Sequence, residues 1–149
     1  MKKMNKKHGF TLIELIIVMV ILGIMAAVAV PRYLDSISNA EESAEDAVIS
    51  AIRSGLKAAA NDSLYTNGRA SWPTNPFNAL SEKPAGYSQD LNDADTDGEW
   101  TFSNGRITHQ RADNSRFEWT YTKGTQNGDN AEIGTLGNRT EIGQQQGPG

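Results

Sequence analysis

The chain has 149 residues, enough for one domain of ordinary size, and a formal net charge of −4 from 14 Lys and Arg against 18 Asp and Glu. Four of the lysines lie within residues 1–9, so the rest of the chain carries 10 minus 18 charges, or −8. An acidic body without a basic patch argues against nucleic-acid binding as the main activity. The chain has no cysteine, which excludes a disulfide framework, a thiol nucleophile and a thiolate metal site.

The first predicted element is an apolar run from Phe10 to Val30, in which Glu14 is the only charged residue. It follows a basic stretch, and export machinery inserts such a run into or across a membrane with the positive residues on the cytoplasmic side. As a helix, the run would be about 31 Å long, which suffices to cross a bilayer core. An ionisable side chain inside such a segment is a functional hypothesis in itself.

Two simple interpretations of this run stay open. An ordinary secretory signal would be cleaved after Ala27-Val28-Ala29 and would release a soluble secreted binding domain that begins at Val30. A permanent single-span anchor would have the right length. Neither interpretation requires the carboxylate of Glu14.

A third interpretation comes from positions 6–33, which read KKHGFTLIELIIVMVILGIMAAVAVPRY. This segment resembles the N-terminus of type IV pilins and type II secretion pseudopilins, and the resemblance covers roughly the first 60 residues. It implies that a prepilin peptidase removes residues 1–9 as a leader by cutting after Gly9, and that it methylates the new N-terminal residue, Phe10. It also identifies Glu14 as the glutamate five residues into the mature chain and Pro31 as the proline that ends the uninterrupted apolar run.

The resemblance implies a structural subunit rather than an enzyme. Its expected function is to polymerise with copies of itself into an extracellular type IV pilus that serves motility, adhesion or DNA uptake. The expected partners are membrane lipid before assembly, the prepilin peptidase and the inner-membrane assembly machinery. The expected location is the inner membrane for the precursor and then the cell surface. A periplasmic pseudopilus of a type II secretion system is the close alternative, favoured by the lack of cysteine and by an acidic loop.

Elementary physics agrees with this interpretation. Cleavage before the apolar run, rather than after it, leaves a helix of residues 10–31 that needs lipid or copies of itself around it. A carboxylate buried among such copies is costly unless it is paired, and the α-amino group of Phe10 in a neighbouring subunit is the cation that this segment offers to Glu14. That pair would set the register between subunits. Gly23 and Pro31 are the expected points of kinking or local melting.

A second helical pattern follows Pro31 and is predicted to continue to about Ala60, so residues 32–60 form the amphipathic second half of one long helix of about 10–60. The expected apolar face consists of Leu34, Ile37, Ala40, Ala44, Ala47, Val48, Ala51, Ile52 and Leu56. The expected polar face consists of Asp35, Glu41, Glu42, Glu45, Asp46 and Arg53.

Residues 61–98 are rich in turn signals such as Asn67-Gly68 and are predicted to form a long irregular connection, which corresponds to the variable αβ-loop of pilins. Within residues 99–122 the period changes to two. We expect a strand with Trp100 and Phe102, a hairpin turn at Asn104-Gly105, a return strand over 106–110, and a third strand. The third strand carries Phe117, Trp119 and Tyr121 on one face.

These elements predict an α+β fold in which the second half of the long helix packs on a small antiparallel sheet. Residues 123–149 are rich in Gly and Asn, with Ile133, Leu136 and Ile142 as the apolar anchors, and the end from Gln144 is expected to be unstructured. In type IV pilins a disulfide usually pins this region. Because this chain has no cysteine, either a different device holds the tail or nothing does.

Candidate chemistry outside the N-terminal segment is sparse. Asp93, Asp95 and Asp97, followed by Gly98, fit the first positions of a calcium loop, but its twelfth position would be Asn104 instead of a bidentate glutamate. A calcium site is therefore one hypothesis, a solvated acidic turn is the favoured one, and no other cofactor is expected. His109 has no nucleophile to serve and is expected to be a surface or packed residue. The aromatic residues of the strands are expected to form the core of the sheet rather than a binding surface.

Overall fold

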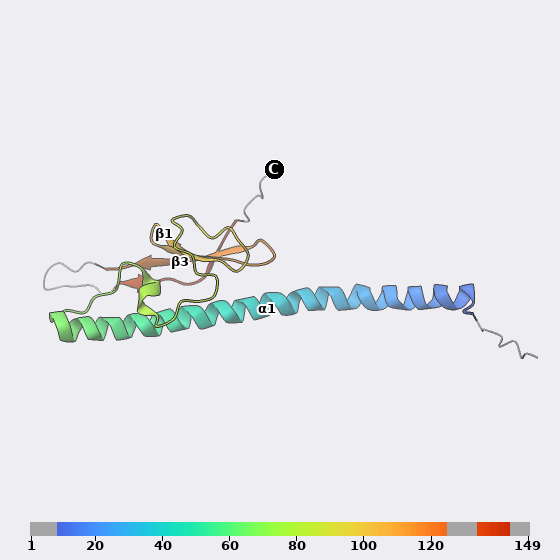
Figure 1. Cartoon of the computed structure of the whole chain (residues 1–149), viewed down its shortest axis with the longest axis horizontal. Helices are drawn as coiled ribbons and strands as arrows, with labels where there is room; N and C mark the ends of the chain where they lie inside the picture. The colour runs from blue at the N-terminus through green and yellow to red at the C-terminus, as the bar shows by residue number, and fades with distance from the viewer. Residues whose placement is uncertain (1–8, 125–133, 144–149) are drawn as a thin grey trace, which may run out of the picture. The chain divides into compact units, whose positions relative to one another are not determined.

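The computed structural model describes residues 9–124 and 134–143 (Figure 1). The chain divides into two units, Met1–Ser43 and Ala44–Gly149. One helix, α1 (Leu12–Asn67), contributes to both, and the second unit adds the short 3-10 helix η1 (Pro76–Ala79) and five strands. The predicted α+β fold, with a long helix and a small antiparallel sheet, is confirmed. The expected leader lies outside the described residues except for Gly9, as does the end from Gln144.

Helix α1 is 56 residues long and ends at Asn67, beyond the predicted end near Ala60. Gly68 stops it: this glycine has a φ of 68° and its N–H donates to the carbonyl of Leu64 at 2.9 Å. A left-handed glycine just after the last turn is a common helix stop because it lacks the Cβ that makes this conformation costly. The Asn67-Gly68 pair is therefore the end of the helix, and the polar residues before it are accommodated in the last turns.

The sheet follows the predicted register. Strands β1 (Trp100–Ser103) and β2 (Arg106–Gln110) form a hairpin in which Trp100 pairs with His109 and Phe102 with Ile107. Its turn has positive φ at both Asn104 and Gly105, the backbone that a two-residue hairpin requires. Strand β3 (Arg116–Thr122) pairs antiparallel with β2. All three predicted strands are confirmed.

Two further strands come from the C-terminal region and both pair with β3. They are β4 (Thr135–Leu136) and β5 (Thr140–Ile142). Of the predicted anchors, Leu136 and Ile142 lie in these strands, and Ile133 lies outside the described residues. The part of the tail that the structure describes is thus integrated into the sheet.

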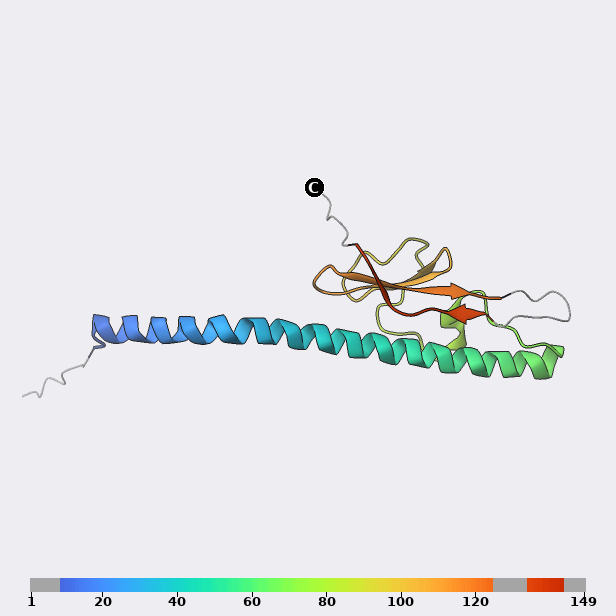
Figure 2. The same ribbon diagram turned by 180° about the vertical axis from the view of Figure 1, so that it is seen from behind.

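The core lies between the C-terminal part of α1 and one face of the sheet (Figures 1 and 2). Its buried members are Ile49, Ile52, Leu56, Phe77, Trp100, Ile107, Trp119 and Tyr121. The helix packs tightly on η1, since a Cβ at Gly55 would lie 2.4 Å from the carbonyl oxygen of Ala79. The aromatic residues of the strands serve the core as predicted, although Phe102 and Phe117 are only half-buried.

The expected inward face of α1 is corrected in part. The residues of the expected face that are exposed are Leu34, Ile37, Ala40, Ala44, Ala47 and Ala51. The buried positions are Glu45, Ile49, Ile52, Leu56 and Ala60, of which Ile52 and Leu56 were predicted. The spacing of these five positions is four, three, four and four residues, which is a regular helical stripe. Alanine is small enough to be tolerated on either side of a helix, so the alanines do not indicate which side is buried. Ile49 has a larger apolar side chain and does indicate the buried side.

The other face of the sheet is also covered, by the connection that precedes β1. Ala94 is fully buried there, and its N–H donates to the Thr108 hydroxyl at 2.8 Å, which lies 2.7 Å from the Thr101 hydroxyl. Earlier in the same connection, Gly86 has a φ of 81° and lies so close to Gly98 that a Cβ would clash with the Gly98 carbonyl oxygen. The alternation of apolar and polar residues along the strands predicted that one face of the sheet would be buried. The structure shows that polar residues on the second face are buried as well.

Candidate functional site

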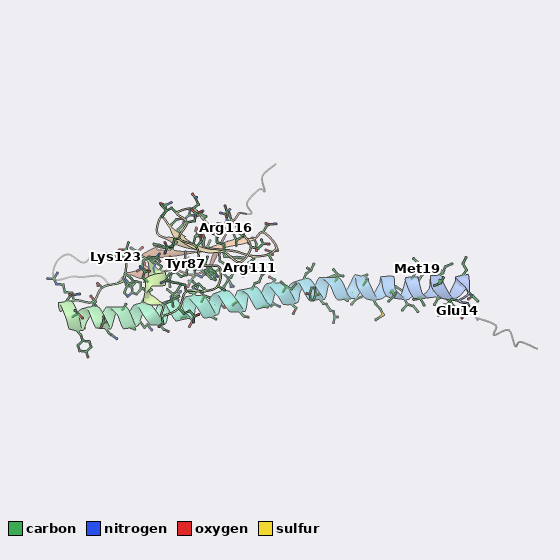
Figure 3. All side chains as sticks on the ribbon, in the orientation of Figure 1. Glu14, Met19, Tyr87, Arg111, Arg116 and Lys123 are labelled. Atoms are coloured by element: carbon green, nitrogen blue, oxygen red, sulfur yellow. The ribbon has the colours of Figure 1, made fainter. Side chains whose placement is uncertain are left out.

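The start of α1 forms a reciprocal cap around Glu14, which lies in the first turn (Figure 3). The Thr11 N–H donates to the Glu14 carboxylate at 2.8 Å, and the Glu14 N–H donates to the Thr11 hydroxyl at 3.3 Å. This capping box satisfies two backbone donors that no helical carbonyl can reach. It also holds the carboxylate at the positive end of the helix dipole, next to the predicted new N-terminus, Phe10.

The apolar run that follows has no cover within its own unit. Its large side chains from Leu12 to Val30 are all exposed, and Figure 3 shows them pointing away from the helix axis around Met19. By length and composition α1 is able to cross a membrane. An exposed helix that is apolar all round requires lipid or other apolar helices as its surroundings.

Gly23 and Pro31 both lie inside α1, which continues through them as a single helix. A Cβ at Gly23 would meet no atom of the described residues within 4 Å, so no contact in that part of the chain requires a glycine at this position. The kinking or melting predicted for these two residues stays a prediction. So do the cleavage after Gly9, the methylation of Phe10 and the pairing of Glu14 with a neighbouring subunit.

The second unit contains a fully buried carboxylate, Glu45, on the C-terminal part of α1. One carboxylate oxygen accepts from Nδ1 of His109 at 2.9 Å and from Nε of Arg111 at 2.7 Å. The other accepts from a second nitrogen of Arg111 at 2.6 Å and from Arg139 at 3.3 Å. Arg111 therefore binds both oxygens at once, the geometry in which arginine and carboxylate interact most strongly.

These donors keep Glu45 ionised. Burial is the largest single influence and acts to raise the pKa, but the hydrogen bonds from Arg111 and His109, together with their charges, outweigh it. They lower the pKa of Glu45 to about 2. Because the carboxylate is ionised, the His109 nitrogen that faces it carries a proton and donates.

Aromatic rings hold the partners of Glu45 in place. The His109 ring stacks on Trp100 with 4.2 Å between ring centroids, and the Arg111 guanidinium lies 4.0 Å from the centroid of Phe117. His109 is thus a packed residue, one of the two outcomes expected for it. No nucleophile is hydrogen-bonded to its ring among the described residues, so the geometry supports a structural role.

The three aspartates of the proposed calcium loop do not converge in the described part of the chain, where no group of three His, Cys, Asp or Glu side chains is arranged to hold a metal. Asp93 instead binds Arg106, with its two oxygens 3.0 and 3.1 Å from one guanidinium nitrogen, and lies 3.8 Å from Arg116. The N–H of Asp95 donates to the Glu99 carboxylate at 2.9 Å. The contacts of Asp93 attach the loop to the sheet, whereas that of Asp95 lies within the loop, and the calcium site stays a prediction.

Sequence reasoning missed two features of these sites. Glu45 was expected on the polar face of the helix, and this is wrong because its charge is compensated by residues that lie more than 60 positions away along the chain. Its spacing of four residues from Ile49 was a usable signal. The cap at Thr11 was also missed, although the Thr-x-x-Glu spacing is its signature.

Comparisons with known proteins concern mainly the N-terminal segment. A family model described as the prokaryotic N-terminal methylation motif matches residues 4–30. The type IV narrow pilus major component PilA5 of Thermus thermophilus is 51% identical over 49 residues, which cover 33% of this chain and 42% of that protein. The type IV major alpha-pilin of Moraxella bovis is 45% identical over 56 residues, 38% of this chain and 35% of that protein.

A longer match is found with a type IV major pilin protein, PilE1, of Neisseria gonorrhoeae. It is 38% identical over 108 residues, which cover 70% of this chain and 44% of that protein. The chain therefore spans less than half the length of each of these three relatives. No solved structure matches the chain significantly.

Proposed function

We propose that this chain, whose N-terminal segment is that of the type IV pilin family, is a structural subunit of a type IV pilus. The subunit polymerises through the helix that begins at Leu12, and the second unit forms its folded head. This function requires no catalytic step, because the subunit acts by assembling into the filament.

The observation that carries this proposal is the combination of an exposed apolar helix with a carboxylate in its first turn. A methylation motif that lies over the same residues, 4–30, predicts cleavage directly in front of this helix. The mature chain would then keep the helix and begin with a free α-amino group at Phe10. The capping box already holds the Glu14 carboxylate beside that end, where a neighbouring subunit's α-amino group is able to pair with it.

The partners and location follow from this chemistry. Before assembly, membrane lipid covers the apolar run, with the lysine-rich residues 1–9 on the cytoplasmic side. A prepilin peptidase and an inner-membrane assembly machinery process and extract the subunit. In the filament, the helices of other copies replace the lipid, and the heads face solvent.

The structure and the relatives favour this function over the two alternatives. Cleavage after Ala29 would cut α1 in its interior, where the helix is continuous from Leu12 to Asn67, so a soluble domain that begins at Val30 is not supported. The three relatives described above are named as pilus components or pilins, which favours a pilus over a secretion pseudopilus.

A matched pair of variants tests the proposal in cells that produce the full chain. Glu14→Ala should leave the amount of processed protein in membranes near the wild-type level, because the apolar run is unchanged, but should reduce sheared filaments at least tenfold. Glu82→Ala, which removes an exposed carboxylate from the head, is the control and should leave filament yield unchanged. Wild-type filament yield from the Glu14 variant would refute the registry role.

A further inference from the structure

The described tail segment, residues 134–142, is attached to the sheet by short pairings. Strand β4 contributes two residues to its pairing with β3, and β5 contributes three. Strands this short bury little surface and are marginal without other contacts. The chain has no cysteine, so the attachment of this segment cannot be a disulfide. Further non-covalent contacts must hold it.

One such contact comes from Arg53 of α1. Its two terminal nitrogens donate to the carbonyl oxygens of Leu136 at 3.2 Å and of Gly137 at 2.9 Å. These carbonyls belong to the last residue of β4 and to the residue after it, where the segment leaves its first pairing with β3. A guanidinium fork on two successive carbonyls fixes both the position and the orientation of the backbone.

A second contact comes from the other end of the segment. Arg139, which directly precedes β5, reaches α1 with one nitrogen 3.3 Å from the buried carboxylate of Glu45 and 3.7 Å from Asp46. Its guanidinium lies 5.7 Å from the ring centroid of Phe117. The two contact points on α1 are eight residues apart, about 12 Å along the helix.

Between these two points the segment approaches β3 closely. The Gly137 N–H donates to the Thr120 carbonyl at 2.8 Å, and a Cβ at Gly137 would lie 2.3 Å from the Thr120 hydroxyl oxygen. The segment is thus pressed onto β3 while two charged side chains connect it to α1. In Figure 2 the red arrow of β4 lies beside β3 on the side of α1.

We propose that Arg53 and Glu45 of α1 form a two-point clamp on residues 134–142, one point by hydrogen bonds to backbone carbonyls and the other by an ion pair with Arg139. We propose further that this segment opens as a local unit when the clamp is broken, while β1, β2 and the core stay folded. The physical reason is that little apolar surface attaches this segment. Leu136 is its half-buried side chain packed against the core, and the polar contacts of α1 with the segment come from Glu45, Asp46 and Arg53. The inference concerns the head alone and does not depend on filament formation.

Hydrogen exchange followed by mass spectrometry on the full chain in detergent micelles tests this directly. Arg53→Met and Arg139→Met keep much of the side-chain volume but remove the charge and the donors. Lys57→Met is the control, because Lys57 is exposed one turn beyond Arg53 and has no hydrogen bond or ion pair within the described part of the chain. Near-ultraviolet circular dichroism should show a folded core in all three variants.

The expected result is local. In the Arg53 and Arg139 variants, exchange in peptides from 134–142 should accelerate about tenfold or more, as for the loss of hydrogen bonds to a charged group. Exchange in 100–110 should remain at the wild-type rate. In the control, both regions should match wild type. Unchanged exchange in 134–142, or equal acceleration in 100–110, would overturn the clamp.

Discussion

Glu45→Gln is the perturbation that tests most directly how the head is held together. Glutamine has nearly the same shape, but it removes the negative charge that Arg111, His109 and Arg139 bind. Removing one partner of a buried ion pair costs about 3–5 kcal/mol. The lowered pKa gives a similar magnitude, since the change from 4.5 to about 2 corresponds to about 3 kcal/mol.

The assay is urea unfolding of the full chain in detergent micelles, followed by tryptophan fluorescence. With a slope of about 1.5 kcal/mol per molar urea, a loss of about 3 kcal/mol lowers the midpoint by about 2 M. The buried Trp100 and Trp119 report on the core, and Asp46→Asn is a matched control, because its side chain is largely exposed. A loss below about 1 kcal/mol would refute the reasoning.

The loss of stability in Glu45→Gln should also depend on pH. The folded pKa of Glu45 lies below its unfolded value of 4.5, so its stabilisation is fully present above pH 4.5 and is lost as pH falls toward 2. The pKa of Asp113 is lowered as well, mainly by its hydrogen bond from the Ser115 hydroxyl. Its protonation therefore adds to the loss of stability at low pH in both wild type and Glu45→Gln. The difference between wild type and Glu45→Gln should therefore shrink between pH 4.5 and 2. A difference that is independent of pH in this window would contradict the assignment.

The remaining predictions concern single sites. Gly55→Ala should destabilise the head by about 1–3 kcal/mol in the same urea assay, because the new Cβ clashes with the carbonyl of Ala79; a gain of about 1 kcal/mol, as expected for an unobstructed helix, would contradict the packing. Calcium added to the full chain should give no binding heat in calorimetry, because Asp93 is paired with Arg106, and a saturable heat abolished by Asp93→Asn would establish the site. Replacing Gly9 by valine should slow processing in cells, as seen by a larger precursor on gels, and normal processing would remove the peptidase argument.

Local patterns were sufficient to predict the first three strands of the sheet but not β4 and β5. The alternation of Trp100 and Phe102, the Asn104-Gly105 turn and the aromatic face of β3 are interactions between near neighbours, and the observed register agrees with them. The apolar run and Glu14 were equally visible, because a membrane segment with one charge stands out by composition. Such features depend on residues only a few positions apart.

The features that the sequence did not predict depend on contacts between residues that are distant in sequence. Glu45 was misassigned because nothing near it in the chain indicates Arg111 and Arg139. Arg53 is exposed, in agreement with the predicted polar face, but no local pattern indicates its hydrogen bonds to backbone carbonyls of the tail. The cover over the second face of the sheet was missed because its key contacts join Ala94 and Asp93 to strand residues through a loop without periodicity.

The central claim is that the apolar helix remains on the mature protein and assembles the filament. Peptide mass spectrometry of the N-terminus, on protein from a sheared surface fraction and from membranes, tests it most directly. The account predicts that the protein in the sheared fraction begins with N-methylated Phe10. A mature protein that begins at Val30, or one that retains Met1 in the surface fraction, would contradict it.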